Sequence, residues 1–229
     1  MRMILLTLSL VLVATSSAFG LGYFYRRQSI VYAHSPIRSI AILSQADQAE
    51  QVGAIIVGDS ITELSYLPEM CGRRVLNAGI GGAKAHEVIE LLRDVLRRVK
   101  TDRVVIAIGV NDAGKSYATD IKSFGDSYRE LVGMAAAAGA QVIVATIAPV
   151  GHDLPEGTGI FDTELIKNFN AEIRNIAIEH HAGVAEVYKD LAAKDGFLPH
   201  DFTVDGVHLT KIGYQPWLHA LEYSACGSS

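Results

Sequence analysis

The sequence is poor in cysteine and in charge, and both shortages narrow the classes of protein to consider. Two cysteines in 229 residues, Cys71 and Cys226, are too few for a disulfide-dense scaffold, and the sequence leaves open whether they pair. Only 20% of the residues are charged, and the formal net charge is -5. A general nucleic-acid-binding protein is expected to be basic, so we predict no nucleic-acid partner. No pair of histidines has metal-ligand spacing with a nearby carboxylate, so no metal site is predicted.

Charge is absent altogether from residues 3–25, a mostly apolar run that follows Arg2 and precedes Arg26 and Arg27. About 20 such residues can cross a bilayer, and a cleaved signal peptide has the same arrangement. A buried core helix is the third alternative. We predict that residues 1–27 form a signal peptide or a single transmembrane anchor. Residues 28–51 are predicted to be a juxtamembrane connector with room for one short helix, and residues 52–225 a folded domain. The expected location is extracytoplasmic, either periplasmic or secreted, with the membrane as a partner if the first segment is not cleaved.

After residue 52, short apolar runs alternate with amphipathic stretches. Runs that are β-branched and nearly continuous in apolar character are typical of parallel strands covered on both faces. They are Ala54–Val57, Val75–Ala78, Arg103–Ile108, Gln141–Ile147 and Val184–Val187. The helices predicted between and after them are 85–99, 120–138, 163–181 and 211–223. This alternation predicts a three-layer α/β/α sandwich with a five-stranded parallel sheet, in which ligands bind beyond the carboxyl ends of the strands.

The loops beyond these strands contain the parts of a nucleophilic site. Ser60 follows the first predicted strand, and Asp205 and His208 lie three residues apart after the fifth. A serine hydroxyl is a weak nucleophile, but a neutral imidazole can accept its proton and a carboxylate can orient that imidazole. The N–H groups of Ser60 and Gly82 and the side-chain amide of Asn111 are candidate donors to an oxyanion. The pattern therefore predicts a catalytic triad and an oxyanion hole.

Four segments in this order, GDSIT, NAGIGG, GVND and DGVHL, resemble the sequence blocks of the SGNH (GDSL-type) hydrolase superfamily. The resemblance runs from about Ala54 to Tyr223. It implies a flavodoxin-like fold and the hydrolysis of carboxylic esters, or of thioesters, without a metal or cofactor. The roles that it implies are nucleophile, base, orienting acid and two oxyanion donors, for Ser60, His208, Asp205, Gly82 and Asn111 respectively.

One departure from the family pattern limits what the resemblance implies about substrate. Many members have Asp-Thr-Thr or a similar triplet after the second block, where this chain has Ala83-Lys84-Ala85. The triad is untouched by this change, but the substrate cannot be taken over by analogy. The expected partner is a small-molecule, lipid or saccharide acyl ester.

Two other functions compete with ester hydrolysis. Residues 109–116 match the G-x-x-x-x-G-K-[ST] phosphate-binding loop and follow a predicted strand, which is typical of a nucleotide-binding protein. Against this, Gly125 interrupts the following helix, and no later strand ends in an acidic residue that would hold Mg²⁺. The remaining alternative is a catalytically idle binding module on the hydrolase scaffold.

Overall fold

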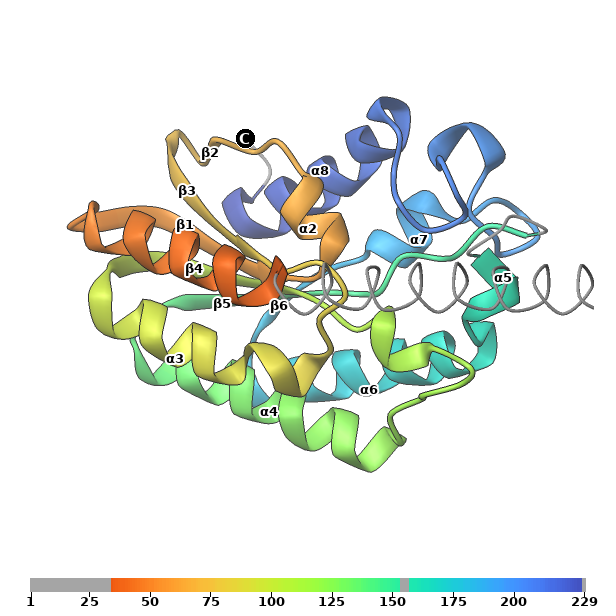
Figure 1. The fold of residues 1–229 in the computed structure, drawn as a ribbon, viewed down its shortest axis with the longest axis horizontal. Helices are drawn as coiled ribbons and strands as arrows, with labels where there is room; N and C mark the ends of the chain where they lie inside the picture. The colour runs from red at the N-terminus through yellow and green to blue at the C-terminus, as the bar shows by residue number, and fades with distance from the viewer. Residues whose placement is uncertain (1–33, 153–156, 228–229) are drawn as a thin grey trace, which may run out of the picture. The chain divides into compact units, whose positions relative to one another are not determined.

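The computed structural model describes residues 34–152 and 157–227, and the compact unit that begins at Ser39 folds around a six-stranded sheet (Figure 1). In chain order the strands are β1 (Gln51–Gly58), β2 (Glu69–Met70), β3 (Arg73–Gly79), β4 (Lys100–Ala107), β5 (Gln141–Ala145) and β6 (Gly183–Ala185). Their order across the sheet is β2-β3-β1-β4-β5-β6. All five predicted strands are present, and they pair in parallel. The sheet is thus an α/β sheet of the doubly wound kind.

Strand β1 occupies the middle of the sheet and is buried from residue 52 to residue 58. Its continuous apolar run is explained by cover on both faces. Gly58, the last residue of β1, lies opposite Gly79 of β3 and Ala107 of β4. Because these three neighbouring strands end at the same level, the loops that follow them meet at one edge of the sheet.

The sheet differs from the predicted five-stranded parallel sheet because β2 adds a sixth, antiparallel strand at its edge. The prediction of a purely parallel sheet was wrong here. Cys71 and Gly72 join β2 to β3, and both have positive φ, 52° and 70°. Two successive residues with positive φ are typical of the tight turn in a two-residue hairpin. A strand of two residues has no periodicity that the sequence could reveal.

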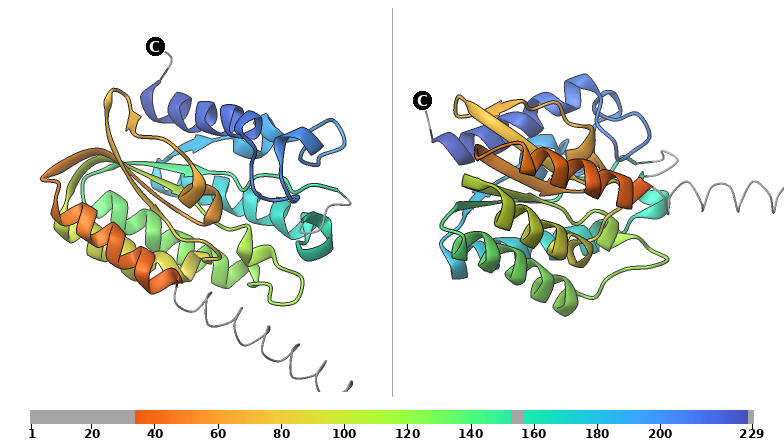
Figure 2. Two further views of the ribbon diagram at one scale, coloured as in Figure 1. Left: turned by 45° about the horizontal axis from the view of Figure 1, so that its top comes forward. Right: turned by 60° about the vertical axis from the view of Figure 1, so that its left-hand side comes forward.

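Helices cover both faces of the sheet (Figure 2). Besides a helix over residues 34–47, the α-helices are α2 (Ser60–Leu64), α3 (Ile89–Arg98), α4 (Ile121–Ala137), α5 (Gly157–Ile160), α6 (Thr163–His180), α7 (Val187–Leu191) and α8 (Lys211–Cys226), with short 3-10 helices at Ala85–Val88, Asn111–Ala113 and His200–Phe202. The four predicted helices correspond to α3 with the 3-10 turn before it, α4, α6 and α8. Helices α3, α4 and α6 pack together on one face, and α7 packs against α8 on the other.

The segment predicted as a connector contains a helix over residues 34–47. The compact unit that holds the sheet begins at Ser39. Ile42 and Ala46 are fully buried in its core, and Asp47 pairs with Arg98 at the end of α3, with 2.8 Å between Nη1 and Oδ1. Residues 39–51 therefore pack as part of the folded domain.

The N-terminal apolar run, residues 3–25, lies outside the described residues. Within the part of the chain that the structure describes, no helix combines the length and the apolar character needed to cross a bilayer.

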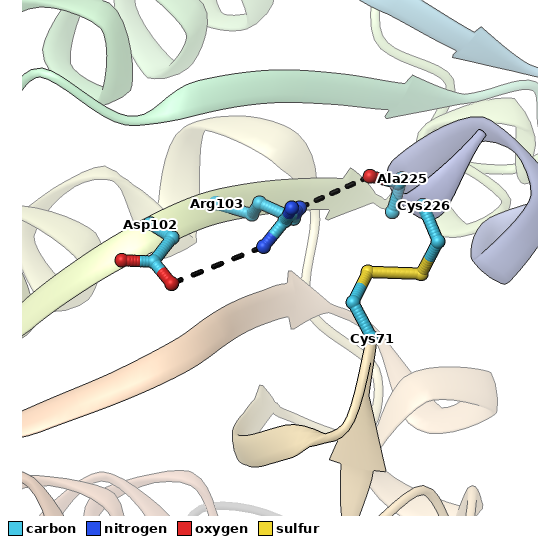
Figure 3. Close-up of a disulfide and its surroundings, with 5 residues drawn as sticks. All are labelled: Cys71, Asp102, Arg103, Ala225 and Cys226. Carbon is cyan, nitrogen blue, oxygen red and sulfur yellow. Dashed lines mark hydrogen bonds and ion pairs between the residues drawn. A yellow bond between two sulfur atoms is a disulfide. The ribbon is translucent and has the colours of Figure 1, made fainter.

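A disulfide joins Cys71 in the β2–β3 turn to Cys226 at the end of α8, 155 residues further along the chain (Figure 3). The two Cα atoms are 5.5 Å apart. Beside it, Arg103 Nε of β4 donates a hydrogen bond to the carbonyl of Ala225 at 3.0 Å. The end of α8 is thus fixed to the β2–β3 turn by a covalent bond and to β4 by a hydrogen bond.

Removing this disulfide should lower the thermal stability of the folded domain. In the loop-entropy model, a cross-link closing so long a loop stabilises by up to about 5 kcal/mol. The Cys71→Ser/Cys226→Ser variant should therefore melt roughly 10 °C below the oxidised protein in differential scanning calorimetry. Reductant should lower the melting temperature of the wild type and leave that of the variant unchanged; equal melting temperatures for oxidised and reduced wild type would contradict the expectation.

Candidate active site

Ser60 lies at a sharp turn from β1 into α2. Asp59 is the N-cap of α2, and its Oδ1 accepts a hydrogen bond from the backbone N–H of Ile61 at 3.0 Å. The turn has no room for a side chain before it, since a Cβ on Gly58 would lie 2.0 Å from Thr62 Oγ1 and 2.4 Å from the carbonyl oxygen of Ala107. Ser60 is partly exposed at the first helical position, beyond the carboxyl end of the sheet.

His208 and Asp205 lie in a loop that an isolated bridge between Thr203 and Leu209 closes. His208 Nε2 is 2.9 Å from Ser60 Oγ, and His208 Nδ1 is 2.6 Å from Asp205 Oδ2. The structure therefore brings the three predicted triad residues into one hydrogen-bonded row, from segments that are 145 or more residues apart.

The loop also fixes the carboxylate of Asp205. Its Oδ1 accepts hydrogen bonds from the backbone N–H groups of Val207, at 3.0 Å, and His208, at 2.8 Å. Burial opposes ionisation of Asp205, but the hydrogen bonds from the His208 ring and from these N–H groups outweigh it, so its pKa lies below the usual value. Asp205 is thus a carboxylate at neutral pH, with one oxygen held by the backbone and the other on the imidazole.

Two of the predicted oxyanion donors, Gly82 and Asn111, lie on the loops after β3 and β4, next to the turn that carries the third, Ser60. Asn111 Nδ2 donates a hydrogen bond to the carbonyl of Ala83 at 3.0 Å, so the asparagine side chain lies against the loop of Gly82. Gly82 has φ 78°, a conformation that favours glycine, although a Cβ would meet nothing within 4 Å. Among the described residues, no hydrogen-bond acceptor is found for the N–H of Ser60 or of Gly82.

These loops are connected by three polar residues that were not predicted from the sequence. Asp112 is completely buried; its Oδ2 accepts from the Ala85 N–H at 3.0 Å, and its Oδ1 accepts from the Thr119 hydroxyl at 2.8 Å. Glu63 Oε2 accepts from the Gly81 N–H at 2.6 Å. Asn77 Nδ2 donates to the carbonyl of Thr62 at 2.7 Å.

These contacts hold the loops after β3 and β4, which carry the predicted oxyanion donors, in register with α2. A signal was present in the sequence, because each of the three residues lies inside or next to one of the four family blocks.

Residues 109–116 do not form a phosphate-binding loop. Asn111–Ala113 is a 3-10 turn, Gly114 forms a bridge with Phe161, and Lys115 Nζ donates to the carbonyl of Thr158 at 2.6 Å. Helix α4 begins only at Ile121, five residues after Ser116, so no helix N-terminus faces the loop as phosphate binding requires. The nucleotide-binding alternative therefore has no support in this geometry.

The fold is that of an SGNH hydrolase. The model of the GDSL-like lipase/acylhydrolase family matches residues 56–215, and the chain belongs to this family. Membership supports ester hydrolysis as the general reaction class. No curated protein sequence matches the chain.

Solved structures of similar fold come from several bacteria. A Streptococcus pneumoniae protein provisionally assigned as a platelet activating factor superimposes with a TM-score of 0.79 at 21% identity, covering 89% of this chain and 98% of that one. A lipase/acylhydrolase from Enterococcus faecalis gives 0.58 at 24% identity, covering 75% and 95%. The acetyl xylan esterase AlAXEase gives 0.61 at 23% identity, covering 76% and 100%.

Two buried carboxyl groups, Asp59 and Asp112, lie beneath the site. Burial raises the pKa of Asp59 to about 6, although the N–H groups of Ile61 and Gly109 oppose the shift. Burial also raises the pKa of Asp112. The Asp112 carboxylate makes ionisation of Asp59 less favourable, while His208 favours the ionised form of Asp59.

The raised pKa of Asp59 predicts a pH-dependent stability. Between about pH 4 and pH 6 the folded protein binds the proton more tightly than the unfolded chain, so this residue destabilises the fold progressively as pH rises through that window. Asp59→Asn keeps a capping side chain without the charge. The free energy of unfolding of the variant, measured with urea and taken relative to that of wild type, should rise by about 2–3 kcal/mol from pH 4 to pH 7.

Asp120→Asn is the matched control, because Asp120 caps the exposed start of α4. Hydrogen bonds from the backbone N–H and the hydroxyl of Ser123 lower the pKa of Asp120. The free energy of unfolding of the Asp120→Asn variant should fall relative to that of wild type as pH rises. A pH-independent difference between Asp59→Asn and wild type would refute the expectation for Asp59.

Proposed function

We propose that the chain is a serine esterase, which hydrolyses carboxylic esters through an acyl-enzyme on Ser60. The observation that carries the proposal is the row of hydrogen bonds from Ser60 through His208 to Asp205, at 2.9 and 2.6 Å. In the tautomer that donates from Nδ1 to Asp205, Nε2 of His208 accepts the hydroxyl proton of Ser60. This is the arrangement that an attacking serine needs.

The reaction runs in two halves. Ser60 Oγ attacks the ester carbonyl carbon while His208 takes its proton, and the tetrahedral intermediate collapses as His208 delivers that proton to the leaving alcohol oxygen. Water then attacks the acyl-Ser60 carbonyl, giving a proton to His208, which returns it to Ser60 as the carboxylic acid leaves. Asp205 stays ionised throughout and stabilises the imidazolium.

The negative oxygen of each tetrahedral intermediate is placed among the N–H groups of Ser60 and Gly82 and the amide of Asn111. Each such donor is worth about 3–4 kcal/mol of transition-state stabilisation. The Asn111 side chain has a second N–H besides the one that contacts Ala83, so it can hold the loop and bind the oxyanion at once.

For the substrate we propose a small-molecule, lipid or saccharide acyl ester, with thioesters as a further candidate class. The acetyl xylan esterase among the structures of similar fold supports the inclusion of acetylated saccharides. No metal or other cofactor enters the proposed reaction.

Replacing Ser60 by alanine should reduce hydrolysis of p-nitrophenyl acetate by at least about a thousandfold, because the nucleophile is lost. The chain offers a matched control: Ser127 ends a second Gly-Asp-Ser sequence, within α4 and away from any strand end. Ser127→Ala should hydrolyse the ester at the wild-type rate.

A fluorophosphonate probe separates an esterase from an idle binding module, because only an activated serine reacts with it. Wild type and Ser127→Ala should be labelled, and Ser60→Ala should not be. An unlabelled wild type, or full turnover by Ser60→Ala, would refute the proposed function.

We also propose that the domain acts outside the cytoplasm, delivered by a signal peptide or held by a membrane anchor in residues 1–27. The apolar run supports this location, and so does the Cys71–Cys226 disulfide, since disulfides persist in oxidising compartments.

The full chain expressed in a bacterial host should appear in the periplasmic or membrane fraction with neither thiol reactive to maleimide after denaturation. Deletion of residues 1–27 should leave it in the cytoplasm with both thiols reactive. Recovery of the full chain in the cytoplasm with free thiols would refute the proposed location.

A further inference from the structure

A groove of about 350 Å³ lies between α2 and α8, outside the triad and the oxyanion donors. It is lined by Leu64, Tyr66, Lys211, Tyr214, Gln215 and Leu218. Leu64 is 63% exposed and Tyr66 is 85% exposed, so both side chains are open to a ligand from solvent. The volume falls within the range of small-molecule binding sites, which are mostly apolar with a few polar groups at defined places.

The groove begins beside the triad, because both helices that form it start there. Ser60 is the first residue of α2, and Leu64 lies four residues later, on the same helical face and about 6 Å along the axis. Helix α8 starts at Lys211, three residues after His208. Leu218 lies about 10 Å further along α8, so the groove extends away from the triad by roughly that length.

The two walls are held together at the triad end. Tyr214 Oη of α8 donates a hydrogen bond to the carbonyl of Ile61 in the first turn of α2, at 2.8 Å. Burial raises the pKa of Tyr214, so the hydroxyl keeps its proton and the contact persists across the physiological pH range. The groove is therefore a preformed feature, with a fixed spacing next to Ser60.

The position of the groove indicates which part of an ester it faces. His208 must reach the leaving oxygen to protonate it, so the alcohol part of the ester lies on the His208 side of Ser60. The oxyanion donors Gly82 and Asn111 belong to the loops after β3 and β4, and neither loop lines the groove. The groove is lined instead by residues that follow Ser60 and His208.

We infer that this groove binds an unbranched alkyl chain of the alcohol part of the ester, an inference that rests on the proposed esterase function. Leu64, Tyr66 and Leu218 supply the apolar contact, and Lys211 and Gln215 form its polar rim. The substrate class is then the ester of a medium-chain alcohol, with a small acyl group over the oxyanion donors.

Isomeric esters test this assignment, because hexyl acetate and methyl heptanoate have the same composition and place the long chain on opposite sides of the ester. The ratio of kcat/KM for hexyl acetate to that for methyl heptanoate should be well above one for the wild type. Leu64→Ser and Tyr66→Ser should each lower the ratio about tenfold, a typical effect of lost apolar contact with a substrate. Ile178→Ser is the matched control, because it removes a large side chain that is 74% exposed on α6, away from the groove. It should leave the ratio unchanged.

The outcomes separate this inference from the proposed function. An unchanged ratio in both groove variants, or a selective loss of methyl heptanoate turnover, overturns the alkyl-chain assignment while leaving the esterase intact. A wild type that hydrolyses no ester overturns the proposed function. In that case binding of 1-hexanol, measured by saturation-transfer NMR, still tests the groove: equal binding by wild type and Leu64→Ser overturns it.

Discussion

The common end point of β3, β1 and β4 is the constraint on which the site depends. Parallel register sets Gly58 opposite both Gly79 and Ala107, so three loops leave the sheet at one level. The close approach of α2 to the end of β3 requires glycine at residue 79, because a Cβ on Gly79 would lie 2.3 Å from the backbone nitrogen of Glu63. A shift of one strand by a single residue would move its loop by about 3.3 Å, more than a hydrogen bond between these loops can absorb.

Polar groups buried at this edge make the arrangement specific at a cost in stability. Asp112 joins the loop after β3 to the loop after β4, and Asp59 caps the helix that starts with Ser60. Burial makes ionisation of both carboxyl groups unfavourable. Removing either group would leave buried backbone N–H groups without acceptors, those of Ile61 for Asp59 and of Ala85 for Asp112. Stability and the geometry of the site are thus opposed in the same few residues.

The sequence was informative where burial imposes a pattern. Five continuous apolar runs correspond to five parallel strands of the sheet. Motifs at strand ends predicted which side chains would meet, and Ser60 Oγ lies 2.9 Å from His208 Nε2. It was uninformative where tertiary contacts decide. The two-residue β2 forms because of its turn and its pairing with β3. Ile42 is buried in the core although its segment was predicted to be a connector. The groove between α2 and α8 is formed by residues that are far apart in the sequence, so no motif predicts it.

The disulfide has a topological consequence that goes beyond its effect on folding. It closes residues 71–226 into a covalent ring that carries Gly82, Asn111, Asp205 and His208, while Ser60 lies outside on the preceding segment. A protease that cuts the backbone once inside the ring leaves both pieces attached. One that cuts between residues 60 and 71 separates Ser60, the proposed nucleophile, from the ring that carries His208, its proposed base. In a protease-rich environment, the short stretch from α2 to β2 is therefore the place where a single cut severs the covalent link between the two halves of the site.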